Sequence, residues 1–142
     1  MTLTPQLPAN LELVTRYAHL ASQPHASLIS HASSGAQVPT VVRIAPYAGR
    51  FVAQMPISSG KVERIAHNRE VLLAPCESNG KLLSDPIPAI ARLMAPEELI
   101  VVSVALTAKY GWWFRALAVA YRLGRLLRLD RARHVGVELT LR

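Results

Sequence analysis

The strongest constraint on the fold is a set of short segments in which side chains alternate between two faces, each bounded by turn residues. Alternation with a period of two residues is the pattern of a β-strand that buries one face. It is clearest over 87–93 and 135–141. The segments predicted as strands are residues 26–32, 38–45, 50–55, 71–74, 87–93 and 134–141. Chains rich in short strands and turns usually close into a small barrel, so we expect a mainly β fold with helices, of the α+β class.

One of these segments, residues 38–45, also predicts which side chains face inward. Val42 and Ile44 would share one face of the strand, and Val41 and Arg43 the other. Turn residues follow it directly, so the next strand is expected to return beside it as a hairpin.

The strand predicted over 87–93 begins among two prolines, Pro86 and Pro88. Proline has no backbone N–H to donate to a neighbouring strand. We therefore expect the start of this strand to lie at an edge of the sheet.

Three segments have helical features. Residues 11–20 carry apolar side chains at helical spacing, with Asn10 as the expected N-cap. Residues 60–67 are predicted to form a short basic helix. Residues 95–108 are ambiguous, because their valines and isoleucine favour a strand, whereas Pro96 in a first turn, followed by two glutamates, favours a helix. The helix is the interpretation that we prefer.

A further helix is predicted to start near Gly111, giving a helical pair over 96–128 before the last strand. Its apolar stripe would comprise Trp112, Ala116, Ala120, Leu123 and Leu127. Residues 1–10 contain two prolines and no periodicity, so we expect a loose arm there. At 142 residues, with no internal repeat and no linker, the chain is predicted to form a single domain.

Composition limits the class of protein and its partners. The chain is 51% hydrophobic, which supplies a core, yet no apolar run approaches the roughly 20 residues that span a bilayer. There is no basic segment followed by an apolar core at the N-terminus, and a single cysteine rules out an internal disulfide, so we expect a cytoplasmic protein. The net charge of +7 predicts an anionic partner, which could be a phosphorylated cofactor, nucleic acid or a membrane surface.

The stretch from Ser58 to Cys76 carries the strongest functional signal. Small polar residues and a glycine precede a basic helix, and Lys61 lies in its first turn. Free N–H groups at a helix start attract phosphate, and a lysine adds a full charge there. The plainer alternative is a serine N-cap beside a solvated lysine. Cys76 ends an apolar run without an evident histidine partner, so we expect a buried, inert thiol.

Other chemistries are disfavoured by what the sequence lacks. It contains no GxGxxG, no Walker lysine loop, no HExxH and no paired CxxC. His25 and His31 are six residues apart, which is not a metal-ligand spacing, so no metal site is expected. The arginine-rich region 115–133 is either a solvated helix face or a surface for a polyanionic cofactor tail, nucleic acid or a membrane.

Five segments, taken in order, resemble a known family: VPTVVRIA (38–45), SGKVERIAHNREVLLAPCESNGK (59–81), PAIARLM (88–94), AKYG (108–111) and VGVELTL (135–141). The chain resembles the pyridoxamine-phosphate-oxidase-like split β-barrel proteins and, more narrowly, the subgroup of enzymes that depend on the deazaflavin coenzyme F-420. The resemblance covers most of the chain from about Ala26 onward. It implies a Greek-key antiparallel split barrel, like that of flavin reductases and FMN-binding proteins. It also implies a homodimer with two cofactor sites at the subunit interface.

The same resemblance implies which residues hold the cofactor. The strand-to-helix corner would bind its phosphate, and neighbouring strands would border its ring. The candidates are Val41, Val42, Arg43, Gln54, Met55, Ser58, Ser59 and Lys61. Segments of the partner subunit near Lys109, Tyr110 and Trp112 would cover the ring. No residue is assigned a catalytic role.

The implied activity is hydride transfer from reduced coenzyme F-420 to a small organic substrate, with the cofactor carrying the chemistry. An FMN-binding protein and a non-catalytic deazaflavin carrier are alternatives within the same fold. A basic module that binds nucleic acid or a membrane surface is the alternative from another class. Two departures from the subgroup stand out. Arg43 replaces a usual aromatic residue, which bears on ring packing and on cofactor or substrate preference. Arg69 replaces a usual proline, which bears on the local turn.

Overall fold

The computed structural model describes residues 9–111 and 133–142, and all structural statements below concern these ranges. They contain seven strands and three α-helices, and a short 3₁₀ turn, Pro96–Glu98, precedes the last helix. In chain order the elements are α1 (Ala9–Ser22), β1 (Ala26–His31), β2 (Gln37–Val42), β3 (Ala45–Tyr47), β4 (Arg50–Pro56), α2 (Gly60–His67), β5 (Glu70–Pro75), β6 (Ile87–Leu93), α3 (Leu99–Tyr110) and β7 (His134–Leu141).

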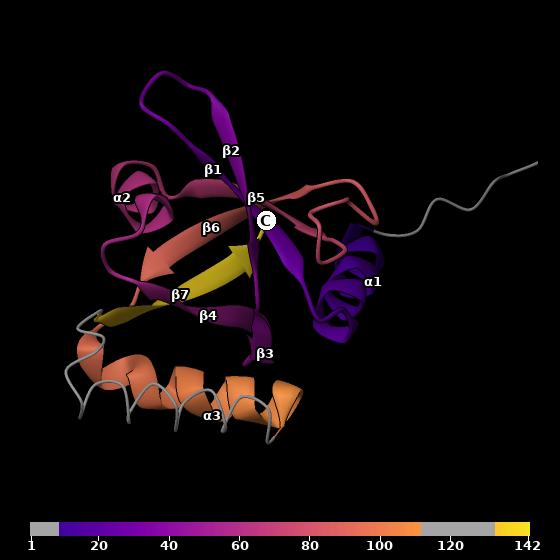
Figure 1. Ribbon diagram of the computed structural model, residues 1–142. Coiled ribbons are helices and arrows are strands. Elements are labelled where there is room, and N and C mark those ends of the chain that lie inside the picture. Colours follow the sequence, from indigo (N-terminus) through magenta and orange to yellow (C-terminus); the bar gives the residue numbers. More distant parts are fainter. Residues whose placement is uncertain (1–8, 112–132) are drawn as a thin grey trace, which may run out of the picture.

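The strands form one antiparallel sheet in the order β2-β1-β5-β6-β7-β4-β3. Its two end strands, β2 and β3, are neighbours in the chain, because Arg43 and Ile44 alone separate Val42 from Ala45. Three Cα–Cα steps span at most about 11 Å, so the two edges of the sheet must lie close together. The sheet therefore curls into a half-barrel (Figure 1). We call the Arg43–Ile44 link the seam.

One apolar cluster fills the inside of this half-barrel. Its largest side chains are Leu20, Leu28, Ile44, Phe51, Met55, Ile65, Leu73, Val137 and Leu139, all of them essentially inaccessible to solvent. A second cluster lies on the other face of β3 and β4, where α3 packs: Ala45, Val52, Met94, Val102, Ala105 and Leu106. Strand β4 is thus buried on both faces, and α3 is fixed beneath it (Figure 1).

Where α3 crosses β7, close packing depends on a glycine. A Cβ atom on Gly136 would lie 2.9 Å from Cγ2 of Val102 and 3.0 Å from Sδ of Met94, closer than carbon atoms normally approach. Because Gly136 has no side chain, the helix can lie directly on the strand. The side chain of Met94, just after β6, fills the remaining space.

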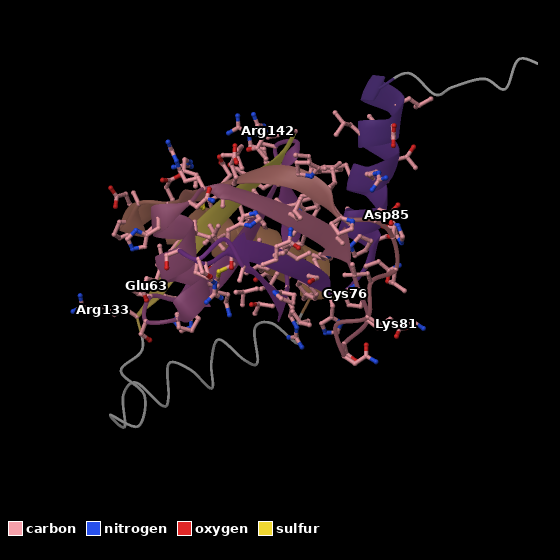
Figure 2. All side chains as sticks on the ribbon, turned by 90° about the horizontal axis from the view of Figure 1, so that it is seen from above. Glu63, Cys76, Lys81, Asp85, Arg133 and Arg142 are labelled. Carbon is pink, nitrogen blue, oxygen red and sulfur yellow. The ribbon has the colours of Figure 1, made fainter. Side chains whose placement is uncertain are left out.

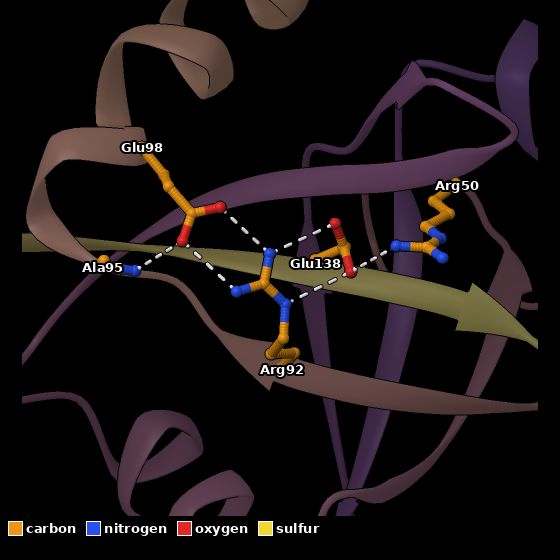
Figure 3. A network of polar contacts seen from close by, with 5 residues as sticks. All are labelled: Arg50, Arg92, Ala95, Glu98 and Glu138. Atoms are coloured by element: carbon orange, nitrogen blue, oxygen red, sulfur yellow. Dashed lines mark hydrogen bonds and ion pairs between the residues drawn. The ribbon is translucent and has the colours of Figure 1, made fainter.

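A network of charged side chains on the outer surface links β4, β6, β7 and the turn before α3 (Figure 3). Arg92 donates to both oxygens of Glu98, at 3.2 and 3.0 Å, and to Glu138 at 3.3 Å. Glu138 also accepts from Arg50 at 3.1 Å, and Glu98 accepts from the backbone N–H of Ala95 at 2.9 Å. The hydrogen bonds from Arg92 hold the pKa of Glu98 below its usual value. Exposed ion pairs contribute little stability singly, so we assign this network to aligning the start of α3 on the sheet.

Most elements follow the sequence predictions. α2, β6 and β7 have the predicted bounds, and residues 96–108 are helical rather than extended, with a 3₁₀ turn leading into α3. The turn at Ala48 and Gly49 has positive φ at both residues, 51° and 77°, as a tight hairpin between β3 and β4 requires. The helix predicted from Gly111, its apolar stripe and most of the expected N-terminal arm lie outside the described residues.

Two local predictions are wrong. Asn10 lies inside α1, which begins at Ala9, so it does not cap that helix. The segment 38–45 is not one strand, because Val42 pairs with β1 while Ala45 pairs with β4, at the two opposite edges of the sheet. Arg43 and Ile44 belong to neither ladder, so the strand is interrupted at the seam.

The edge position predicted for the start of β6 holds for its first two residues, which pair with β5 and not with β7, although β6 itself lies between those two strands. Pro88 pairs with Leu72 of β5, and its carbonyl accepts from the N–H of Arg142 at 3.0 Å. The N and C=O of one residue in an antiparallel strand point to the same neighbour. The nitrogen of Pro88 therefore faces the residue just beyond β7, where the ladder ends. The missing N–H costs one terminal hydrogen bond, which an interior strand can tolerate.

Candidate functional site

The corner between β4 and α2 is built by a tight turn of the backbone. The N–H of Ile57 donates to the carbonyl of Arg133 at 2.8 Å, and the N–H of Ser59 donates to Pro56 at 3.0 Å. The first helical bond of α2 runs from the N–H of Glu63 to the carbonyl of Ser59, at 3.4 Å. The three N–H groups before it, on residues 60–62, have no helical acceptor and point away from the helix start. We call residues 57–64 the corner.

Ser59 occupies the N-cap position but does not act as a cap. Its side chain makes no hydrogen bond to the helix, although its backbone is extended as an N-cap requires. Its Oγ is the one buried side-chain polar atom of the described residues that has no hydrogen-bond partner. Buried polar groups are nearly always paired, so an orphan hydroxyl at a helix start indicates a missing acceptor or donor.

Arg64 adds a cation that the sequence analysis missed. Its Nε donates to Oγ of Ser30 at 2.7 Å, and Ser30 is wholly buried in β1. A Cβ atom on Gly60 would lie 2.9 Å from Nη1 of Arg64, so the guanidinium lies over the first residue of the helix. The available signal was spacing: Arg64 follows Gly60 by four residues and Lys61 by three, which places them on one helix face.

The corner is electropositive, judged from the charged residues that the structure describes. Lys61 and Arg64 make no ion pair with any described carboxylate, although Glu63 is exposed between them. The helix start adds partial positive charge through its free N–H groups. An oxyanion is the ligand that this combination of charges and donors accommodates. The corner shows no nucleophile held by a base.

The other residues predicted for the corner differ in their access to a ligand. Gln54 is half-buried and Ser58 is exposed. Met55 is 1% exposed because its side chain belongs to the interior of the barrel, so in this conformation it is not accessible to a ligand. Ser58, Ser59 and Lys61 lie on the turn and in the first turn of α2, and their part in a cofactor site stays a prediction.

A second group of predicted residues gathers at the seam instead. Nζ of Lys109 donates to the carbonyl of Ile44 at 2.8 Å, and to that of Leu20 at 3.5 Å. The hydroxyl of Tyr110 lies 2.8 Å from the carbonyl of Pro24 and 3.1 Å from that of Ile44. The guanidinium of Arg43 lies over the Tyr110 ring, 5.9 Å from its centroid.

Burial perturbs both titrating groups at the seam. It lowers the pKa of Lys109 to about 8, since the charged form loses hydration. It raises the pKa of Tyr110 to about 12, against the opposing effects of Arg43 and the hydrogen bond to Ile44. Perturbed groups of this kind occur at functional sites and also at structural clamps. Here every donor is directed at the chain's own backbone, which is the behaviour of a clamp.

The two groups of predicted residues lie at different places in the fold. Figure 1 shows α2 at one side of the sheet and the C-terminal end of α3 at the other. Along β2, Val38 pairs with Ser30, which holds Arg64, whereas Val41 lies three residues further, about 10 Å away. Val41 is exposed and Val42 is buried in the core. Trp112 lies outside the described residues.

No group of three or more potential metal ligands occurs among residues 9–111 and 133–142. Cys76 is buried, and burial raises the pKa of its thiol, as expected for an inert cysteine. Within the described ranges, no helix combines the length and the apolar character needed to cross a membrane.

The sequence matches no family model and no curated protein. Solved structures do match the fold. Rv2991 from Mycobacterium tuberculosis, a conserved protein without a described function, has a TM-score of 0.65 at 14% identity, over 100% of this chain and 86% of that one. The heme storage protein HutZ from Vibrio cholerae has a TM-score of 0.63 at 9% identity, over 97% and 92%. A protein from Listeria innocua, described as a candidate pyridoxamine 5′-phosphate oxidase, has a TM-score of 0.56 at 10% identity, over 92% and 93%.

These likenesses define the class of fold. The chain has the split β-barrel fold of pyridoxamine-phosphate-oxidase-like proteins, as the resemblance predicted. At identities of 9–14%, these similarities establish the fold but not the activity or the ligand. The F-420 subgroup and the homodimer stay predictions.

Proposed function

We propose that this chain is a homodimeric oxidoreductase that binds coenzyme F-420 with its phosphate at the corner between β4 and α2. The observation that carries the proposal is the buried hydroxyl of Ser59, which has no hydrogen-bond partner among the described residues. It lies beside the free N–H groups of the helix start and beside Lys61, which forms no ion pair within the described ranges. These are donors without an acceptor, and a phosphate supplies acceptors in the same place. Because the corner would recognise only the phosphate, the same reasoning applies to any cofactor with a phosphate ester.

Each residue of the corner has a defined part in this proposal. Lys61 neutralises the phosphate, and the N–H groups of residues 60–62 donate to its oxygens. Less than 1 Å² of the Ser59 hydroxyl oxygen is exposed, so its contact with the phosphate requires a rotation about χ1. Such rotations of small side chains are fast. Val41 and Arg43 would border the ring, as the resemblance implies.

The reduced deazaflavin, when bound, supplies a hydride, so the protein's contribution is to bind, orient and exclude water. This division of labour agrees with the corner, where the described residues form no acid–base pair or nucleophile. Coenzyme F-420 also carries a polyglutamate tail, whose charge suits a chain of net charge +7. FMN in the same corner is the second candidate, because the anchoring chemistry is shared.

Replacing Lys61 tests the proposal. Lys61→Ala should weaken the binding of F-420 or FMN tenfold or more, since a charge-assisted contact contributes about 1.5–3 kcal/mol. The matched control is Lys81→Ala, which removes an exposed lysine at the end of the molecule opposite Glu63 of α2 (Figure 2). Fluorescence titration of the wild type and both variants gives the three affinities. Equal affinities for the two variants would rule out the corner as the phosphate site.

Salt dependence separates the proposal from the alternative of a basic module. Binding that follows a polyphosphate backbone falls steeply between low and physiological salt, because counterions are released. A ring held against strands, with one phosphate contact, should lose far less affinity. Tight, salt-sensitive binding of nucleic acid or anionic vesicles, without binding of either cofactor, would favour the basic module.

A further inference from the structure

Arg64 is held in place by a residue distant in the sequence. Its Nε donates to Ser30 at 2.7 Å, and Ser30 is completely buried, 34 residues away in β1. That single bond leaves the terminal nitrogens, Nη1 and Nη2, with no hydrogen-bond acceptor among the described residues. An arginine that is held through Nε can still donate from its two terminal nitrogens to two oxygens of one anion.

Gly60 leaves room for the guanidinium of Arg64 at the helix start. Helical side chains lean toward the N-terminus, so Arg64 reaches back over the residue four positions earlier. A Cβ atom at position 60 would stand 2.9 Å from Nη1, in the space that the guanidinium occupies. The glycine therefore brings the guanidinium against the first residue of α2, next to the free N–H groups of the corner.

Without an anion, this arrangement is electrostatically unfavourable. Lys61 and Arg64 are like charges three residues apart on one helix face, which destabilises a helix by a few tenths of a kcal/mol. Lys61 also lies in the first turn, where the helix dipole disfavours a cation. Arg64 belongs to the last turn, but its guanidinium reaches back over Gly60 toward the helix start. Glu63 is exposed and forms no ion pair with either within the described residues. An anion placed between the two cations reverses the sign of each of these interactions.

We propose that Arg64, positioned by Ser30 and admitted by Gly60, is a second phosphate-contacting residue of the corner, which binds a phosphate ester through two cations rather than one. This inference rests on the proposed anion site at α2. It assigns to Ser30 the role of a positioning residue and to Gly60 that of a space-making residue. The ligand class is a phosphate ester, with inorganic phosphate as its simplest mimic.

The test uses inorganic phosphate on the whole protein and measures unfolding rather than turnover. Phosphate should raise the urea midpoint of the wild type more than that of Arg64→Gln, because a ligand of the native state stabilises it. The general stabilising effect of phosphate as an excluded salt is common to both proteins and cancels in the comparison. Arg64→Gln should weaken the apparent affinity for phosphate about tenfold. Arg69→Gln, an exposed arginine just beyond the end of α2, is the matched control and should change it less than twofold.

Two further variants keep the test valid if Arg64→Gln fails to fold. Ser30→Ala retains the charge of Arg64 but releases Nε, and it should weaken phosphate binding a few-fold. Gly60→Ala displaces the guanidinium and should do the same. Arg64→Lys should recover only part of the loss, since a lysine has no fork.

The outcomes distinguish this inference from the proposed function. If Lys61→Ala weakens binding while Arg64→Gln behaves like Arg69→Gln, Arg64 only fastens α2 to β1, and the inference is overturned while the phosphate corner stands. If phosphate binding depends on Arg64 but neither F-420 nor FMN binds the wild type, the two-cation corner stands and the proposed function fails.

Discussion

At the scale of single residues, two glycines inside regular elements lie where a side chain would collide with a neighbouring residue. Gly60 admits the guanidinium of Arg64, and Gly136 admits Val102 and Met94. Neither has a positive φ, so backbone freedom is not the reason for either. The sequence shows a glycine in a helix start and another in a strand. It does not show what approaches them, because the approaching residues are distant in the chain.

Gly136 gives a prediction about stability. Gly136→Ala places a methyl group 2.9 Å from Val102 and 3.0 Å from Met94, and overpacking of this kind costs about 1–3 kcal/mol. The measurement is the free energy of unfolding in urea. The double variant Gly136→Ala with Val102→Ala is the control: the two changes should be less costly together than their sum. A loss below about 0.5 kcal/mol in the single variant would contradict this account of the contact.

The candidate site could be predicted only in part, because some of its residues are brought together from distant parts of the chain. Ser59 and Lys61 were found from sequence because a helix start and its charges are local features. Arg64 was missed because its role depends on Ser30, which only the folded sheet brings to it. Within one chain, the polar atoms of Lys109 and Tyr110 contact backbone carbonyls. That this segment of a partner subunit covers the cofactor ring stays a prediction.

At the scale of elements, the seam between β2 and β3 decides how the half-barrel closes. The two strands pair with opposite edges of the sheet, and the carbonyl of Ile44 between them accepts from Lys109 and lies 3.1 Å from the Tyr110 hydroxyl. The C-terminal end of α3 therefore fastens the seam to the end of α1. The alternation of Val42 and Ile44 was predicted correctly, since both are buried. The interruption at the seam was not predictable, because strand partners are not local.

The seam predicts a dependence of stability on pH. Burial lowers the pKa of folded Lys109 to about 8, from about 10.5 when it is exposed. Between these values the unfolded chain binds more protons, so stability must rise with pH in this window. The folded pKa of Tyr110 is raised to about 12, so its contribution is constant below about pH 10. The wild type should therefore gain on the order of 1–2 kcal/mol between pH 8 and 10 relative to Lys109→Met.

Urea unfolding at several pH values from 7 to 10 measures this gain. Lys81→Met, at an exposed lysine, is the control and should give a curve parallel to that of the wild type. Parallel curves for the wild type and Lys109→Met would show that the amine is not desolvated in the folded state.

At the scale of the whole molecule, the fold was predictable and the order of its strands was not. Alternating segments and turns located six of the seven described strands, and their number favoured a barrel. Strand β3 was missed, because Pro46 and Tyr47 were expected to belong to the turn that follows. The order in the sheet places β6 between β5 and β7, although its prolines suggested an edge. Pro88 is accommodated because its nitrogen faces the end of the β7 ladder, a detail that depends on register.

The fold alone leaves the ligand open, because heme storage is described for one structural neighbour and pyridoxamine phosphate chemistry is suggested for another. In the part of the chain that the structure describes, the feature that points to a ligand is the corner, with its two cations and its donors that have no acceptor there. We therefore expect the corner to recognise a phosphate group.

The most direct test compares ligands that differ only in that group. The wild-type protein is titrated by fluorescence with coenzyme F-420 and with the same deazaflavin lacking its phosphate and tail, and in parallel with FMN and riboflavin. We expect at least one phosphorylated member to bind ten times or more tightly than its phosphate-free counterpart, since the corner's charge-assisted contacts contribute about 1.5–3 kcal/mol. Equal affinity within both pairs would contradict the account.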